Sequence, residues 1–172
     1  MAKQNLAHIS KKNKVIEILS RKKIHKAGLL HRESDCLIIN HNGVLLHKAE
    51  SSKKWGHFNG DVDYREQYKD AALRIFRDAT KFHLTAKHIK KVAEYQRCVT
   101  TEDGINNRWA KVYLSILPIR EKSLIEKIPE DMDIKYFSRI ELLDLLMNNK
   151  KILGSTKYLL TKVPIFLYNC VP

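Results

Sequence analysis

The chain has 172 residues, of which 44% are hydrophobic and 30% are charged, a composition typical of one soluble globular domain. No run of about 18 apolar residues occurs, which argues against a membrane partner, and the polar N-terminus lacks the apolar core of a secretion signal, so we expect a cytoplasmic protein. The formal net charge of +13 favours polyanionic partners such as a nucleotide or RNA, although scattered basic residues also fit an ordinary solvated surface.

The hydrophobic pattern predicts one domain, residues 1–172, without an internal repeat or a linker. Residues 1–12 are expected to be a basic, disordered extension. An Asn42-Gly43 turn is typical of a hairpin, because both positions tolerate positive φ. The segments that the pattern predicts as strands are, in chain order, 13–20, two runs within 34–49, 55–60 (a short strand or loop), 89–101, 107–119 and 133–138.

Helices are predicted at 66–82, 139–149 and 155–164, the last with Ser155 as its N-cap. In the first of these, Leu73, Phe76 and Phe82 carry the apolar stripe and should be buried. The order of elements predicts an α/β (α+β) fold in which a mixed β-sheet is sandwiched between helices.

The three cysteines, Cys36, Cys98 and Cys170, show no spacing typical of metal ligands. Cys36 and Cys98 sit inside apolar runs and are predicted to be buried thiols.

Residues 60–82, GDVDYREQYKDAALRIFRDATKF, resemble the signature helix of the MutT-like Nudix hydrolases. That family's pattern is G, five residues, E, seven residues and then R-E-U-x-E-E-x-G-U, where U is a bulky aliphatic residue. Gly60, Glu66 and Arg74 fall on its three widely spaced positions, and Asp78 takes the first place of the E-E pair.

Three positions of the pattern are not kept: Ile75 and Ala79 replace glutamates, and Lys81 replaces the glycine. The chain ahead of the box is similar to the lead-in of the Nudix branch that includes isopentenyl-diphosphate isomerase. The resemblance runs from about Asn13 to Pro164 and implies a Nudix-like fold.

The resemblance also implies the chemistry. Positions 75, 78 and 79 share one helix face, which in working members holds carboxylates for Mg²⁺ or Mn²⁺. Here the patch reads Ile, Asp, Ala, so the active site is degenerate and Mg²⁺ is a doubtful cofactor. The candidate catalytic residues are Glu66, Arg74 and Asp78, with Glu66 bracing Arg74, and the candidate metal residues are Asp78 and Gly60. Glu102 and Asp103 are alternative acids that could rebuild a metal site.

Isomerase activity is not expected, because Asn59 stands where that enzyme has its cysteine and INNRW, residues 105–109, replaces its E-x-E. His25 and His31 fall near the places of two of its metal-binding histidines. Convergence of His25, His31 and His57 on a separate transition-metal site stays open.

Three functions remain. The first is a weak diphosphate hydrolase with an altered metal set. The second is a non-catalytic binding module for a nucleotide or RNA, with Lys53, Lys54 and Trp55 as the preferred ligand contacts because an aromatic ring beside lysines could stack a base. The third is a protein-interaction module in which Ile75 and Ala79 are core or interface. Loss of two of the three patch carboxylates favours the second and third. The resemblance and this loss together predict a Nudix-like protein that acts on or binds a nucleoside or other organic diphosphate and is impaired in metal-dependent hydrolysis.

Overall fold

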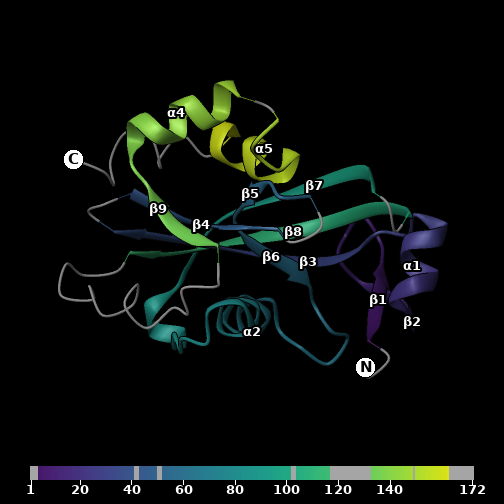
Figure 1. Cartoon of the computed structure of the whole chain (residues 1–172). Coiled ribbons are helices and arrows are strands. Elements are labelled where there is room, and N and C mark those ends of the chain that lie inside the picture. Colours follow the sequence, from purple (N-terminus) through teal and green to yellow (C-terminus); the bar gives the residue numbers. More distant parts are fainter. Residues whose placement is uncertain are drawn as a thin grey trace.

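The computed structural model of the chain describes residues 4–40, 43–49, 52–101, 104–116, 133–148 and 150–162. A nine-stranded mixed sheet lies between helices, with α2 on one face, α4 and α5 on the other, and α1 at one end (Figure 1). The strands are β1 (Asn5–Ile9), β2 (Val15–Ser20), β3 (His31–Asn40), β4 (Gly43–Lys48), β5 (Trp55–Gly56), β6 (Phe58–Asp61), β7 (Lys90–Thr101), β8 (Gly104–Ile116) and β9 (Ile134–Phe137). The helices are α1 (Arg21–Ala27), α2 (Tyr68–Thr80), the short η1 (Ala86–His88), α4 (Arg139–Met147) and α5 (Gly154–Lys162).

Strand β3 organises the sheet. It pairs in parallel with β8 and antiparallel with β1, β4 and β6. β7 and β8 form a long antiparallel hairpin, and β9 pairs with β4. The predicted fold class is therefore confirmed, a mixed sheet between helices.

The alternation of side chains along β3 separates two cores, because successive residues of a strand point to opposite faces. Cys36 and Ile38 pack with Phe58 and Phe76 on the α2 face. Leu37 and its odd-numbered neighbour Ile39 pack instead with the side chains of α4 and α5, among others Leu142, Leu159 and Leu160. The odd positions that precede Leu37 on β3 belong to the same face as α5, and they are polar.

Helix α2 matches the helix predicted from Glu66 to Phe82, although it is shorter at both ends. Phe76 is fully buried, as predicted, whereas Leu73 and Phe82 are partly buried against the same core. Lys81 ends the helix in the left-handed conformation, with φ at 60°. The family's glycine would suit this position better, because left-handed backbone disfavours residues with a Cβ.

Four expectations need correction. Residues 5–9 are not a disordered extension: they form β1, in which Leu6, Ala7 and Ile9 are buried. Helix α1 was not predicted at all, because its sequence RKKIHKA has only one strongly apolar residue. Ser155 lies inside α5, which begins at Gly154, so it is not the N-cap.

The fourth correction concerns the thiols. Cys36 is buried, which confirms its prediction, but Cys98 is exposed: among the described residues β7 pairs with β8 alone, which puts Cys98 on a strand at the edge of the sheet. Cys170 and Asn42 lie outside the described residues. Within the described ranges, no helix is both long enough and apolar enough to span a membrane.

Candidate functional site

The loop that enters α2 is braced as predicted. Arg74 donates from Nε to Glu66 Oε1 over 2.8 Å and from Nη2 to Glu66 Oε2 over 2.9 Å, a bidentate ion pair. Nη2 also donates to the backbone carbonyl of Asp61 over 3.0 Å. Hydrogen bonding to Glu66 raises the pKa of Arg74. The pair thus joins α2 both to the loop before it and to the end of β6.

The α2 patch contains one carboxylate. Asp78 has a side chain that is 57% exposed and lies 3.4 Å from the guanidinium of its neighbour Arg77. Ile75 and Ala79 are partly buried against the α2-side core. Among the described residues, no cluster of possible metal ligands includes Asp78. The residues on α2 therefore do not fit Mg²⁺, which needs several oxygen ligands. Glu102 and Asp103 lie outside the described residues.

Gly60 lies under α2. A Cβ at this position would stand 3.3 Å from Ile75 Cδ1, so a larger residue would press on the helix. Glycine thus lets β6 and α2 approach closely, a structural role that operates whether or not its carbonyl binds a metal.

The predicted ligand contacts lie at the start of β5. Trp55 is partly buried, packs edge-on against Phe137 at 4.8 Å between ring centroids, and has the Lys48 ammonium 5.6 Å from its ring. Lys53 is exposed and Lys54 is partly exposed. The two lysines are accessible to a ligand, whereas Trp55 is partly committed to the core.

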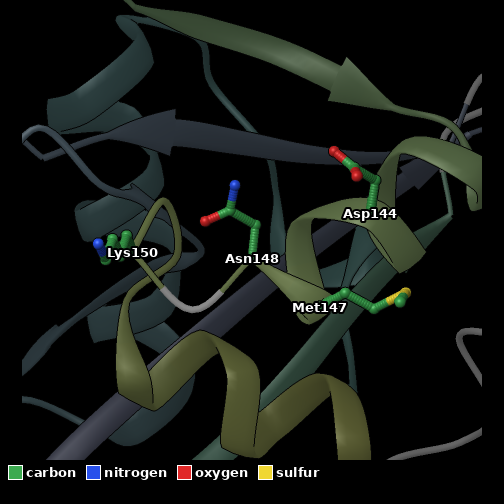
Figure 2. A pocket seen from close by; sticks show the side chains of 4 residues that line it. All are labelled: Asp144, Met147, Asn148 and Lys150. Atoms are coloured by element: carbon green, nitrogen blue, oxygen red, sulfur yellow. The ribbon is translucent and has the colours of Figure 1, made fainter.

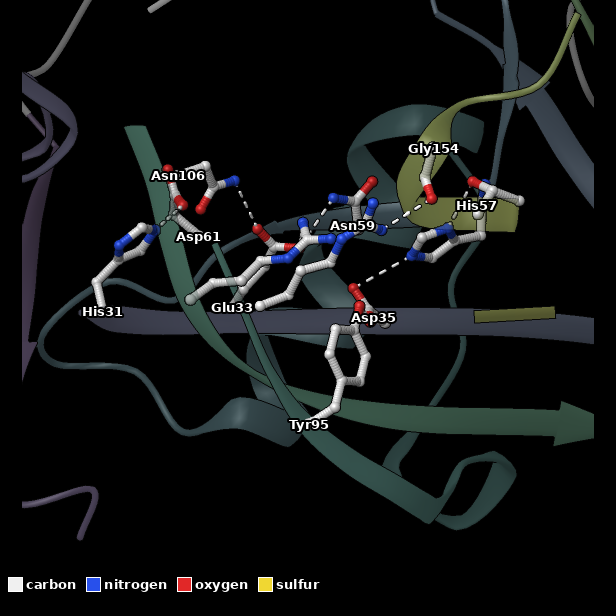
Figure 3. Close-up of polar contacts among 12 residues, drawn as sticks. His31, Glu33, Asp35, His57, Asn59, Asp61, Tyr95, Asn106 and Gly154 are labelled. Atoms are coloured by element: carbon white, nitrogen blue, oxygen red, sulfur yellow. Dashed lines mark hydrogen bonds and ion pairs between the residues drawn. The ribbon is translucent and has the colours of Figure 1, made fainter. Parts of the chain in front are cut away.

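The largest concentration of buried polar groups lies on the other face of the sheet, the face that also receives α5. We call it the polar face; it is formed by the odd residues 31–35 of β3, residues 57, 59 and 61, residues 106 and 108 of β8, and Tyr95 and Arg97 of β7. Figure 3 shows these side chains as a row, with the His31–Asp61 contact at one end and the His57–Asp35 contact at the other.

At the α1 end, His25, His31 and Asp61 offer ligand atoms that all lie within 4.8 Å of one another. His31 Nε2 is 3.1 Å from Asp61 Oδ1, and His25 Nε2 is 3.5 Å from Oδ2, which also accepts a hydrogen bond of 2.8 Å from Arg21 Nε. His57, the third histidine considered from the sequence, does not join this group.

The electrostatics of this cluster follow from its contacts. Burial alone raises the pKa of Asp61, but the contacts with His25 and His31 and the charge of Arg21 outweigh it and hold that pKa far below the usual range. Burial lowers the pKa of His31, yet the hydrogen bond to Asp61, the charge of Asp61, the hydrogen bond to the Leu29 carbonyl and the charge of Glu33 together outweigh it, and the net shift of the pKa is upward.

The donor set of the cluster fits a transition metal. Two imidazoles and a carboxylate suit zinc, manganese or iron. His31 Nδ1 donates to the carbonyl of Leu29 over 3.1 Å, which turns Nε2 toward Asp61, as backbone carbonyls orient metal-binding histidines. Both ring nitrogens of His25 are buried; Nε2 has the 3.5 Å contact with Asp61 Oδ2, and Nδ1 has no hydrogen-bond partner among the described residues. The Arg21 guanidinium on Asp61 competes with a metal for the same carboxylate.

The centre of the row is Glu33, which is 1% exposed. Its Oε1 accepts from Asn59 Nδ2 over 3.0 Å and from Arg108 Nη1, and its Oε2 accepts from Asn106 Nδ2 over 3.2 Å. The buried carboxylate is thus fully hydrogen-bonded, as a buried charge must be.

At the α5 end, Asp35 accepts from Tyr95 Oη over 2.7 Å and lies 3.2 Å from His57 Nε2. His57 Nδ1 lies 2.8 Å from Thr156 Oγ1. Although burial raises the pKa of Asp35, the His57 imidazole and Arg108 outweigh it and lower that pKa. Thr156 is fully buried, so this chain of contacts ties α5 to the sheet and leaves its hydroxyl no room to act as a nucleophile.

Sequence analysis did not single out Glu33, Asp35, Tyr95 or Arg108. A signal was present in β3, whose sequence HRESDCLIIN places charges at alternate positions of a strand that is buried almost throughout. Charged residues are rarely buried unless paired, so such a pattern predicts a buried polar network once the strand is known to be central.

A separate surface hollow of about 470 Å³ lies at the C-terminal end of α4. Asp144, Met147, Asn148 and Lys150 line it, and Figure 2 shows their side chains around the turn between α4 and α5. None of these residues belongs to the polar face or to the α2 patch.

The sequence matches no protein-family model, and no curated protein matches it. Solved structures do share the fold. Protein DR0079 of Deinococcus radiodurans has a TM-score of 0.68 at 15% identity, covering 92% of this chain and 98% of its own. The Nudix domain of Shewanella oneidensis NrtR, solved with ADP-ribose, has a TM-score of 0.58 at 16% identity, covering 83% and 90%.

A third similar structure is the bifunctional NMN adenylyltransferase/ADP-ribose pyrophosphatase of Francisella tularensis, solved with AMP and manganese. It has a TM-score of 0.54 at 19% identity, covering 77% of this chain and 40% of its own. At these identities the comparisons establish that the chain has the Nudix fold.

Proposed function

We propose that this chain binds a nucleoside diphosphate derivative or another organic diphosphate and is impaired in metal-dependent hydrolysis. The observation that carries the proposal is a Nudix fold whose α2 patch holds Asp78 as its one carboxylate, exposed and beside Arg77. The net charge of +13 supports an anionic ligand. Similarity to an ADP-ribose-bound Nudix domain and to an ADP-ribose pyrophosphatase supports the choice of a diphosphate.

The impairment has a physical cause. Hydrolysis at a diphosphate needs a cation that polarises the phosphate and activates water. A single exposed carboxylate beside a guanidinium offers Mg²⁺ little compensation for the waters it must give up. The hydrocarbon side chains of Ile75 and Ala79 contain no oxygen ligand and pack against the core instead.

The His25–His31–Asp61 cluster is the set of described residues that best fits a metal, and its nitrogen donors favour zinc or manganese over magnesium. A metal held there would supply Lewis acidity at the α1 end of the polar face. The resemblance to the isomerase lead-in supports this assignment, since His25 and His31 are the histidines that it aligns with metal ligands.

Lys53 and Lys54 are proposed as the outer contacts of the ligand. Both side chains reach solvent at the start of β5, whose strand partner β4 carries Lys48 beside the Trp55 ring. Their charges would attract a phosphate or an RNA backbone, and Trp55 offers a base less surface than a free ring would.

The test is equilibrium binding of ADP-ribose and ADP by calorimetry at low and at moderate salt. In parallel, phosphate and nucleotide release is measured with Mg²⁺, Mn²⁺ and a chelator. We expect binding that weakens as salt rises, because ion-pair formation with phosphates releases counterions, and little turnover. Turnover that the chelator abolishes would contradict the impairment, and absence of binding at low salt would contradict the ligand class.

A further inference from the structure

Two arginines are held next to each other on the polar face. Arg97 of β7 and Arg108 of β8 are direct partners in the antiparallel register. Directly opposed residues project from the same face of a sheet with Cβ atoms about 5 Å apart, and like charges in this arrangement repel. The fold therefore sets two positively charged side chains beside each other on one face of the sheet, with the charge of Arg108 partly offset by its ion pair with Glu33.

One edge of the Arg108 guanidinium is unused. The residue is 2% exposed, and its Nη1 pairs with Glu33. Its Nε and Nη2 are buried and have no hydrogen-bond partner in the part of the chain that the structure describes. A buried N–H group without an acceptor is costly, so native proteins provide each with a partner, a water or a ligand.

The two unused nitrogens lie on one edge of the guanidinium and can bind one oxyanion together. Nε and Nη2 form the side of the guanidinium from which two parallel hydrogen bonds reach one oxyanion. In this chain Arg74 uses the same two atoms to hold the Glu66 carboxylate, at 2.8 and 2.9 Å. Glu33 does not take them up: its oxygens accept from Asn59, Asn106 and Arg108 Nη1.

Arg97 provides the accessible side of the site. It is partly buried, donates from Nη1 to the carbonyl of Gly154 over 2.8 Å, and lies with its Cζ 4.9 Å from the Tyr158 ring. Both contacts are to α5, which fixes the guanidinium in place. The hydrogen bond to Gly154 uses one of five N–H groups, so donors remain for a ligand that arrives from solvent.

We propose that Arg97 and Arg108 form a phosphate subsite on the polar face, where one phosphate group of the ligand accepts hydrogen bonds from both guanidinium groups. The proposal rests on the proposed function and adds to it the place and the donors of the ligand's phosphate. A phosphate satisfies the unused edge of Arg108 and relieves the repulsion between the arginines. Guanidinium is suited to this task, since its planar fork matches phosphate oxygens.

The test uses inorganic pyrophosphate as the probe and compares two charge-removing variants. Arg97→Gln removes the accessible guanidinium. Lys111→Gln is the matched control: Lys111 is three residues beyond Arg108 on β8, hence on the opposite face, where its Nζ lies 4.4 Å from the Tyr68 ring. We expect Arg97→Gln to weaken pyrophosphate binding about tenfold or more, as for loss of a charged hydrogen bond, and Lys111→Gln to change it less than about twofold.

A direct readout is the Nε–Hε nuclear magnetic resonance signal of Arg108, assigned through the variant Glu33→Gln with Arg108→Gln. This double change removes both members of the buried ion pair and so avoids an isolated charge. If it does not fold, the signal is assigned through neighbouring residues, and the Arg97 comparison still decides. We expect pyrophosphate to shift the Arg108 signal at the concentrations at which it binds.

The outcomes separate the subsite from the proposed function. The subsite is overturned if the Arg97 and Lys111 variants weaken pyrophosphate binding equally. It is also overturned if saturating pyrophosphate leaves the Arg108 signal unmoved, in which case water fills the unused edge. If ADP-ribose binds with the same affinity to the parent and to Arg97→Gln, the subsite fails and the proposed function stands. If pyrophosphate binding is weakened tenfold in Arg97→Gln but no nucleotide binds the parent, the subsite stands and the proposed nucleotide ligand fails.

Discussion

Replacing Arg74 with alanine tests the brace between α2 and its entry loop. The change removes both hydrogen bonds to Glu66 and the bond to the Asp61 carbonyl. The Glu66 side chain is 16% exposed and that of Arg74 is 32% exposed, so the pair lies between a surface ion pair, which contributes about 0–1 kcal/mol, and a buried one, whose breakage costs about 3–5 kcal/mol. We expect a loss of about 2 kcal/mol in the free energy of unfolding, after allowing for water that reaches the carboxylate.

The measurement is urea unfolding followed by circular dichroism, with Arg77→Ala as the control. Arg77 is on the same helix and has the same charge, but its guanidinium contacts the exposed carboxylate of Asp78, at 3.4 Å. Its removal should change stability by less than about 0.5 kcal/mol. A double-mutant cycle with Glu66→Gln then isolates the pair. Equal stabilities of Arg74→Ala and Arg77→Ala would refute the argument that bidentate geometry and partial burial make this pair important.

Three further predictions concern the two faces of the sheet. Because the pKa of Asp35 is lowered from 3.8 on folding, its contribution to stability is present above pH 3.8 and is lost as the pH falls through the folded pKa. Asp35→Asn should therefore flatten the acid limb of the plot of unfolding free energy against pH, measured by urea unfolding, and parallel plots for parent and variant would contradict this. Zinc should raise the melting temperature of the parent and of the control His88→Ala, which changes an exposed histidine, but not that of His31→Ala. An equal rise in His31→Ala would show that the His25–His31–Asp61 cluster is not the metal site. Ile75→Glu with Ala79→Glu should restore an acidic face with Asp78 and some Mg²⁺ binding by calorimetry, at a cost of about 1–3 kcal/mol in stability because both positions are partly buried. If the heat of Mg²⁺ titration is the same as for the parent, the missing carboxylates are not the sole defect.

Much of the fold could be predicted from the sequence, because most of its elements have a recognisable pattern of apolar residues within their own segment. The helical spacing of apolar residues marked α2, and the alternating runs marked β3, β4, β7 and β8. Glu66 and Arg74 were paired correctly because the resemblance supplied their relation. Helix α1 and strand β1 were missed for a common reason: each is short, and each is stabilised by contacts with distant segments, such as the pairing of β1 with both β2 and β3.

The candidate site was harder to predict, because its residues come from four strands, two helices and the link between β5 and β6. His31, Glu33 and Asp35 are close in sequence, but their side-chain partners lie 22 to 75 residues away, from His57 for Asp35 to Arg108 for Glu33. Such pairings depend on sheet register, which a single sequence does not fix. The resemblance also drew attention to α2, where the family's chemistry would be, and away from the opposite face, where this chain concentrates its buried charge.

The distribution of charge argues that the two faces now differ in role. On the α2 face, Ile75 and Ala79 extend the hydrophobic core, and Asp78 is left in solvent. On the polar face, carboxylates and guanidinium groups are taken out of water, which costs several kcal/mol for each ion and is only partly repaid by their mutual attraction. Apolar residues of similar size would often stabilise the same position as well or better. A buried network in which two guanidinium nitrogens of Arg108 have no acceptor among the described residues is therefore poorly explained by stability alone, and it is better explained by a ligand that completes it.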